Sequence, residues 1–201
     1  MVCRYCILLD RGDQSPEASG SSRQSRSLRD LGGAAAAVAA GLEGTGLRLL
    51  VLRAAELSVA TQIELFSRAR LLIGSHGAGL ANLLYLPSGA GVIELLPAHG
   101  INNQLTPGCG LLAECGYTQF WHSAATLQLD YRAVLIHGAA WGTNVSLPRA
   151  SLTRAVADAV VEQQARVLDS ALPAAGGKTD AFLVDGYGRV ASAHASAPPD
   201  K

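Results

Sequence analysis

Aromatic residues and long apolar runs are scarce in this sequence. Phe, Trp and Tyr make up 5% of the 201 residues, although hydrophobic residues in total reach 49%. A core of that size must be built mainly from Leu, Val, Ile and Ala. No stretch reaches the roughly 18 apolar residues that a membrane-spanning helix needs, and no basic segment followed by an apolar one opens the chain. We therefore expect neither a membrane span nor a signal peptide.

The chain also lacks an excess of charge of either sign. Sixteen Lys and Arg residues balance sixteen Asp and Glu residues. Such a protein has no overall field to attract nucleic acid or an acidic membrane surface. We expect no nucleic-acid partner, and any anionic ligand must be bound by local groups.

Cysteines are too few and too unevenly spaced to predict a metal site. Cys3 and Cys6 form a C-x-x-C pair, whereas Cys109 and Cys115 have the wrong spacing for the second half of a zinc knuckle. The pattern favours an incidental pair beside a strand. Disulfides remain possible if the chain is lumenal.

What the sequence does contain is an alternation of apolar runs and helical patterns. Continuous apolar runs predict buried parallel strands, with helices covering both faces of the sheet. We expect strands at 5–9, 47–52, 71–74, 91–95, 117–121 and 127–136, and helices at 28–42, 59–70, 80–85, 105–115 and 151–168. The fold class is therefore α/β with a Rossmann-like parallel sheet. Residues 1–170 form this domain, 13–27 a flexible loop, and 171–201 a low-complexity tail expected to be disordered.

The main candidate site is the glycine-rich turn that follows the third expected strand. Ser75, His76, Gly77, Ala78 and Gly79 lead from this strand into a short helix. A helix start offers unpaired N–H groups and a positive dipole end, and glycines let a phosphate approach the backbone. The histidine can add a donor or a positive charge. A tight strand-to-helix connection without a ligand is the alternative interpretation.

Three charged residues are expected near the same rim of the sheet, because ligands of parallel sheets bind beyond the carboxyl ends of the strands. Glu94 lies inside the next apolar run, at the end of the expected strand, where an acidic residue can hold ribose hydroxyls. Arg11 and Arg26 follow the first strand and can pair with phosphate. A solvated surface arginine is an equally good interpretation of each.

Two other enzyme classes share parts of this pattern. In a Rossmann dehydrogenase the fingerprint requires Gly or Ala where Asn82 stands. An α/β-hydrolase uses a similar H-G-A-G segment as an oxyanion hole, but it needs a G-x-S-x-G elbow, and the sequence contains none. Both matches are incomplete, and the hydrolase match is the weaker one.

A longer run of residues resembles the family-61 glycosyltransferases, which include plant xylosyl- and arabinosyltransferases and animal O-linked N-acetylglucosaminyltransferases of the secretory pathway. The shared elements follow in order: Q-x-x-x-F at 62–66, H-G-A-G-L-x-N at 76–82, aromatic-x-P-x-G at 85–89 and V-x-E-L at 92–95. The resemblance is strong over 58–96 and thin over the rest of 4–123. Upstream, Arg11 matches the family, and Arg29 stands where the family has asparagine.

The resemblance implies the C-terminal, donor-binding domain of a GT-B fold. It implies an inverting transfer of a sugar such as xylose, arabinose or N-acetylglucosamine from a nucleotide diphosphate sugar (UDP-sugar) to a glycan or glycoprotein hydroxyl, without an obligatory metal or other cofactor. His76 would be the catalytic residue, and the donor would contact Arg11, Arg26, Ser75, His76, Gly77, Ala78, Gly79, Leu80, Asn82 and Glu94. An N-terminal half would supply the acceptor site and the general base, and the setting would be the Golgi or endoplasmic reticulum lumen. A binding module without turnover is the alternative.

Overall fold

The computed structural model describes residues 5–11, 28–97, 119–136, 147–170, 181–184 and 190–193. Its centre is a sheet with strand order β2-β1-β3-β4-β5-β6-β7. The strands are β1 (Tyr5–Leu9), β2 (Arg48–Leu52), β3 (Ala69–Ser75), β4 (Gly91–Pro97), β5 (Asp130–Ile136), β6 (Ala181–Val184) and β7 (Val190–Ala193). All neighbouring pairs are parallel except β6 and β7. The predicted α/β class with a parallel sheet is confirmed.

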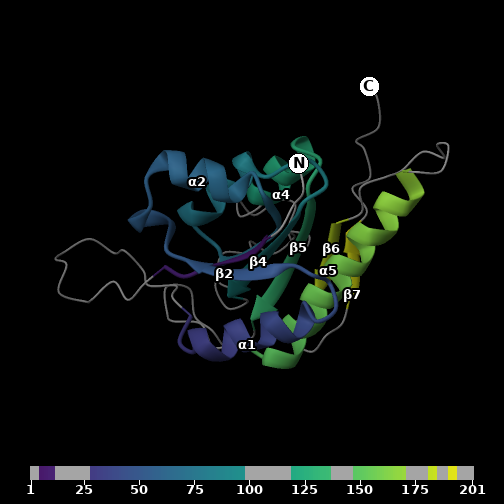
Figure 1. Ribbon diagram of the computed structural model, residues 1–201. Coiled ribbons are helices and arrows are strands. Elements are labelled where there is room, and N and C mark those ends of the chain that lie inside the picture. The colour runs from purple at the N-terminus through teal and green to yellow at the C-terminus, as the bar shows by residue number, and fades with distance from the viewer. Residues whose placement is uncertain are drawn as a thin grey trace, which may run out of the picture.

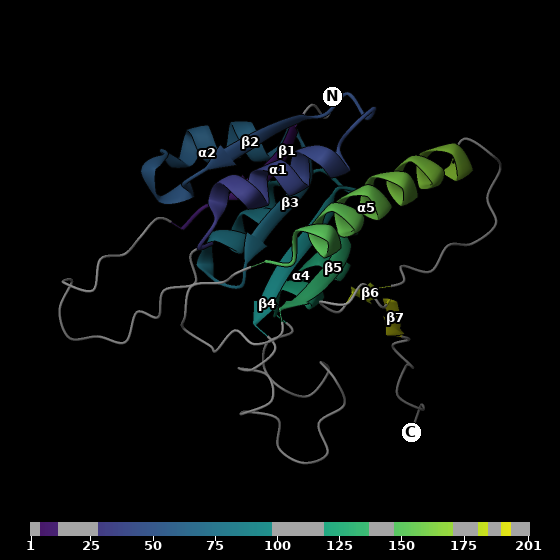
Figure 2. The same cartoon turned by 90° about the horizontal axis from the view of Figure 1, so that it is seen from below.

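Helices cover both faces of this sheet (Figure 1). On one face lie α1 (Leu31–Gly41) and α5 (Arg149–Ser170), which run side by side in Figure 2. On the other face lie α2 (Val59–Phe66), the 3₁₀ helix η2 (Ala78–Tyr85) and α4 (Gln119–Thr126). A short 3₁₀ turn, η1 (Ala54–Glu56), links β2 to α2.

Two separate apolar clusters fix these layers. Successive residues of a strand point to opposite faces, so Cys6 and Leu8 pack under α1 and α5, whereas Ile7 and Leu9 pack under the opposite layer. Leu71 and Ile73 alternate with Leu72 in the same way. The small aromatic content is sufficient because aliphatic side chains fill most of both clusters.

Side-chain caps begin two of the helices. The Asp30 carboxylate accepts a hydrogen bond from the Gly33 backbone N–H at 2.8 Å, and the Ser58 hydroxyl accepts one from the Thr61 N–H at 3.2 Å. Each cap satisfies one of the N–H groups that a helix start leaves without an internal partner.

Several expected boundaries differ from the structure. Residues 119–126 form α4, not the end of a strand at 117–121, because Phe120 and Ala124 lie one helical turn apart and are both buried. Strand β4 continues to Pro97, two residues beyond the expected end. Two short strands, β6 and β7, lie in the segment 171–201, most of which we expected to be disordered. The expected loop at 13–27 and helix at 105–115 fall outside the described residues.

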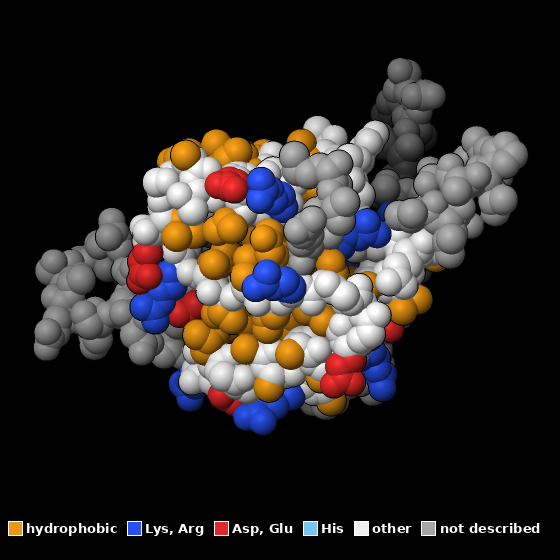
Figure 3. Space-filling view, viewed as in Figure 1, with side chains coloured by type: hydrophobic (Ala, Val, Ile, Leu, Met, Phe, Trp, Pro, Cys, Tyr) orange, Lys and Arg blue, Asp and Glu red, His pale blue; other side chains and the backbone are white. Residues whose placement is uncertain are grey.

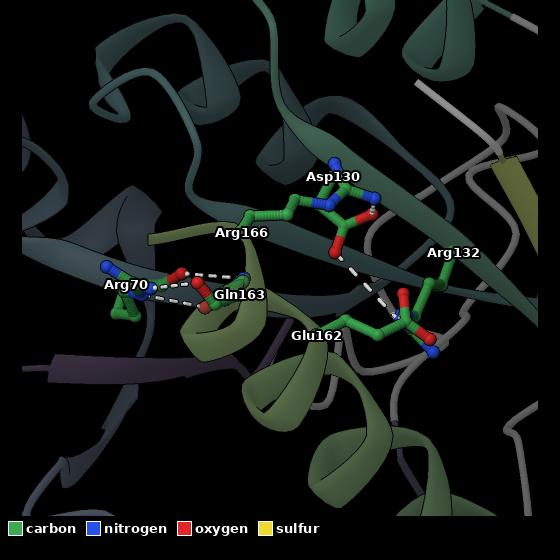
Figure 4. Close-up of polar contacts among 6 residues, drawn as sticks. All are labelled: Arg70, Asp130, Arg132, Glu162, Gln163 and Arg166. Atoms are coloured by element: carbon green, nitrogen blue, oxygen red, sulfur yellow. Dashed lines mark hydrogen bonds and ion pairs between the residues drawn. The ribbon is translucent and has the colours of Figure 1, made fainter. Parts of the chain in front are cut away.

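A polar network fastens α5 to the amino ends of the strands (Figure 4). Arg70 donates from Nε to the Gln163 Oε1 at 2.8 Å and from NH2 to the Gln163 backbone carbonyl at 3.0 Å. Buried Arg132 lies 2.5 Å from the Glu162 carboxylate, and Arg166 donates to Asp130 at 3.3 Å. These contacts lie at the edge opposite to the glycine turn and hold the helix that covers the sheet.

Strand β2 forms one edge of the sheet and remains partly exposed. Its apolar residues are only half-buried, and Val51 is 42% exposed. Hydrophobic side chains gather on the face of the molecule where this strand lies (Figure 3). Within the described residues, no helix is long and apolar enough to cross a membrane.

Candidate functional site

The glycine turn begins where β3 ends at the carboxyl edge of the sheet. Gly77 adopts φ 148°, a backbone conformation that residues with a Cβ rarely adopt. The Leu80 N–H donates to the Gly77 carbonyl at 2.9 Å, which starts η2 immediately after the turn. The expected short helix at 80–85 is therefore a 3₁₀ helix that begins two residues earlier.

A cavity of about 350 Å³ opens beside this turn. It lies at the carboxyl ends of β1 and β3, which are neighbours in the sheet. From β1 the chain continues through α1 to β2 on one side of this pair, and from β3 it continues through η2 to β4 on the other side. This is the topological switch point of a doubly wound sheet, where such proteins bind their ligands. The lining residues are Leu9, Asp10, Arg11, Arg53, Ala54, Ala55, Glu56, Ser75, Ala78 and Gly79.

Arg11 lies directly against the turn. Its NH1 donates to the His76 backbone carbonyl at 3.3 Å, and a Cβ added to Gly77 would stand 2.5 Å from the same nitrogen. The guanidinium is exposed on the cavity side. The absence of a side chain at Gly77 thus lets a cation sit beside the start of η2.

An ion-paired group forms another part of the cavity wall. The Arg53 Nε lies 2.8 Å from the Asp10 carboxylate, and its NH1 lies 3.3 Å from Glu56. The wall itself is held by Gln62 of α2, whose side chain donates to the carbonyls of Ala54 at 2.9 Å and Leu57 at 3.0 Å. The glutamine of the Q-x-x-x-F motif therefore shapes the cavity without lining it.

His76, Glu94 and Tyr131 form a buried chain across three neighbouring strands. The His76 Nδ1 bonds one oxygen of the Glu94 carboxyl group, and the Tyr131 hydroxyl donates to the other. The side chains of His76 and Glu94 are 5% and 0% exposed. Phe120 of α4 contacts the imidazole edge-on, with 5.4 Å between the ring centroids. The His76 backbone N–H also donates to Leu95 at 3.1 Å, so the turn is tied to β4 twice.

The hydrogen bonds among His76, Glu94 and Tyr131 indicate which of these side chains act as donors. Burial, and then the neighbouring Glu94, raise the pKa of the Tyr131 phenol well above its usual value, so the phenol keeps its proton and remains a donor. A carboxylate only accepts, and it therefore holds a proton on the His76 Nδ1.

The structure brings some of the expected site residues together and separates others. Arg11, Ser75, Ala78 and Gly79 line the cavity. Leu80 is fully buried in the core, and the Asn82 amide donates to the Gly79 carbonyl at 3.0 Å, so both support the turn. Arg26 lies outside the described residues.

Glu94 occupies a different position from the one that its sequence context suggested. Its side chain is 0% exposed, and both oxygens bond neighbouring side chains. The reason is that β4 runs on to Pro97, so Glu94 is in the middle of the strand and not at its end. The expected ribose contact would require this carboxylate to leave the buried chain.

Sequence reasoning missed four polar residues of this region: Asp10, Arg53, Glu56 and Tyr131. Asp10 and Arg53 each follow the last residue of an apolar strand, which is a usable signal for a position at the carboxyl edge. Nothing in the sequence marks Tyr131, because it lies inside a buried apolar run. Among the described residues, no group of three or more His, Cys, Asp or Glu is placed to hold a metal ion.

Fold and site together define a doubly wound α/β protein whose candidate site lies at the switch point of the sheet. Comparison with known proteins then points to a family. Residues 6–93 of the chain match the model of the family Glycosyltransferase 61. The resemblance seen in the sequence is confirmed.

One similar curated protein is the zebrafish (Danio rerio) protein O-linked-mannose beta-1,4-N-acetylglucosaminyltransferase 2. It is 39% identical over 62 residues, which is 30% of this chain. The aligned part spans 11% of the length of that relative. The similarity therefore concerns one part of a much longer enzyme.

Proposed function

We propose that this chain is the donor-binding domain of an inverting glycosyltransferase, corresponding to the C-terminal domain of a GT-B fold. One observation carries the proposal: the glycine turn of the family motif borders a cavity at the switch point, with Arg11 beside it. The ligand class is a nucleotide diphosphate sugar. The family match over residues 6–93 supports this class.

The diphosphate binds at the start of η2. Backbone N–H groups of Gly77, Ala78 and Gly79 face the phosphate oxygens, and the hydroxyl of Ser75 adds a donor. Arg11 neutralises part of the charge through bidentate bonds. Arg26, which the sequence also suggested, keeps the same proposed role.

His76 acts as the catalytic residue by stabilising negative charge on the departing nucleotide. Glu94 bonds the Nδ1 and fixes the orientation of the imidazole. Preorganised positive groups beside a leaving group lower the barrier because they need no rearrangement during the reaction. In this scheme Glu94 and Tyr131 are positioning residues.

The rest of the reaction belongs to other parts of a complete enzyme. The donor is a UDP-sugar carrying xylose, arabinose or N-acetylglucosamine, and the acceptor is a hydroxyl of a glycan or glycoprotein. An N-terminal half supplies the acceptor site and a general base, and no metal is obligatory. The proposed setting is the lumen of the Golgi or endoplasmic reticulum, as for the family.

A binding module without turnover is the second candidate. The aligned segment spans 11% of the zebrafish relative, so most of the parts of that enzyme have no aligned counterpart here. Donor binding is common to both candidates, whereas sugar transfer belongs to the first. A Rossmann domain that binds NAD is the less favoured third candidate.

Calorimetry with UDP, UDP-sugars and NAD tests the proposal on the purified chain. We expect UDP to bind, and Arg11→Met to weaken UDP binding by about 1.5–3 kcal/mol because a charged hydrogen bond is lost. Arg68→Met is the matched control, since Arg68 is a surface arginine paired with Glu64 on α2, away from the cavity lining. Binding of NAD in preference to UDP, or equal effects of the two variants, would contradict the proposal.

A further inference from the structure

The cavity has two chemically different ends. Near the glycine turn it offers Arg11 and the start of η2, which suit an anion. Near β2 it offers Asp10 and Glu56, joined by Arg53. If the proposed diphosphate occupies the first end, the second end is available to another part of the ligand.

The charge of the second end disfavours phosphate there. Two carboxylates surround one guanidinium, so the group carries a net negative charge. A phosphate would be repelled, whereas a hydroxyl can donate to a carboxylate oxygen and gain a charge-assisted hydrogen bond. Vicinal hydroxyls, as on ribose or a hexose, fit such a wall.

Asp10 is the better placed of the two carboxylates. Its backbone N–H donates to the Leu52 carbonyl at 2.9 Å, and the Arg53 Nε holds its Oδ2 at 2.8 Å. Its side chain is 8% exposed, compared with 65% for Glu56. The carboxylate is therefore fixed before a ligand arrives, and a preorganised group loses little entropy on binding.

The carboxylate expected from the sequence for this task is turned away from the cavity. Glu94 is 0% exposed and bonds His76 and Tyr131. Asp10, in contrast, lines the cavity, and its carboxylate can accept hydrogen bonds from hydroxyls.

We propose that Asp10, oriented by Arg53, accepts hydrogen bonds from vicinal hydroxyls of the bound nucleotide sugar. The inference rests on the proposed donor site and deepens it. Asp10 is a binding residue, and Arg53 is its positioning residue. The hydroxyls belong to the ribose or to the transferred sugar, and these two sources are separated by the choice of ligand.

The test compares four ligands, UDP, 2′-deoxy-UDP, 3′-deoxy-UDP and UDP-N-acetylglucosamine, on wild type and Asp10→Ala by calorimetry. With ribose as the source, wild type loses about tenfold or more in affinity when the relevant hydroxyl is removed. The affinity of Asp10→Ala for UDP should be lower than that of wild type by a similar factor. Removal of that hydroxyl should not lower the affinity of this variant further, because the two changes remove the same hydrogen bond.

With the sugar as the source, the deoxy nucleotides bind wild type as UDP does. UDP-N-acetylglucosamine then binds wild type more tightly than UDP, and Asp10→Ala removes that advantage. Asp158→Ala is the control, since Asp158 lies half-buried on α5 and not at the cavity. Arg53→Met should reproduce part of the Asp10→Ala effect, and Arg68→Met should not.

Equal affinity of all four ligands for wild type would overturn the inference, as would additive losses from Asp10→Ala and hydroxyl removal. Either result would leave the donor site itself in place, because UDP still binds. If Asp10→Ala does not fold, Asp10→Asn and the ligand series on wild type decide the question. Absence of UDP binding to wild type would instead refute the proposed function.

Discussion

At the scale of single residues, the site depends on which polar side chains are buried and with what partners. Glu94 and Tyr131 are placed on adjacent strands and both point into the layer beneath α4. A buried carboxylate is costly unless its oxygens are bonded, and here each oxygen has a bonded side chain. The chain of three side chains therefore stabilises the fold while it holds the glycine turn.

Tyr131→Phe tests that account. Removing the hydroxyl leaves a buried oxygen of Glu94 without its donor. We expect the free energy of unfolding to fall by about 1–3 kcal/mol. Urea denaturation measures the change. Tyr85→Phe is the control, because Tyr85 packs half-buried against the same apolar cluster, and it should change stability by less than about 0.5 kcal/mol. Similar losses in both variants would argue against the buried chain.

At the scale of elements, the layers are set by close contacts as well as by apolar patterns. The end of α1 packs directly on α5: a Cβ on Gly41 would stand 2.6 Å from the Thr153 carbonyl and 2.8 Å from the Val156 Cβ. The Thr153 hydroxyl also donates to the Ala37 carbonyl at 2.9 Å. The two helices thus approach as closely as a residue without a side chain permits.

Two substitutions in the same helix separate packing from helix propensity. Gly41→Ala should destabilise the protein by about 1–3 kcal/mol, because backbone of α5 would have to shift. Gly32→Ala should be neutral or stabilise by up to about 1 kcal/mol, because its Cβ meets only Asp30 at 3.9 Å and alanine favours helix. Thermal unfolding of both variants checks this, and a stabilised Gly41→Ala protein would show that α1 and α5 are not in contact.

Most elements were predictable because their patterns are local. The strand at 5–9 and the cap at Ser58 follow from apolar runs and side-chain chemistry within a few residues. The segment at 117–121 was misjudged because its aromatic residues suit a strand as well as a helix. Only the packing of Phe120 and Ala124 on one face decides for a helix.

At the scale of the whole molecule, stability depends on a sheet interior that excludes water. Cys6 lies in β1 with 0% exposure, and burial raises the pKa of its thiol from 9.0 to about 12. The unfolded chain releases this proton near pH 9, whereas the folded chain retains it. A group with a raised pKa contributes stability below its unfolded pKa and loses that contribution as pH rises toward its folded pKa.

The alkaline range therefore gives a measurable prediction. Between pH 8 and 10, the thiol should cost the wild-type protein about 1.4 kcal/mol of unfolding free energy. Cys6→Ala lacks this thiol, so its loss over the same range should be smaller by that amount. Urea titrations under reducing conditions at both pH values provide the test. Parallel pH dependence in the two proteins would mean that Cys6 is accessible to hydroxide.

The sequence by itself determined the α/β class, the glycine turn at 75–79 and the similarity to the family, because each depends on local pattern or on residue identity in order. The tertiary structure alone decided which carboxylate meets the cavity. Glu94 follows the glycine turn in sequence, yet it lies in the middle of β4 and is buried against His76 and Tyr131. Asp10 is distant in sequence from the turn, and parallel pairing of β1 with β3 brings it to the same edge. Pairing between remote strands depends on contacts that no local pattern encodes.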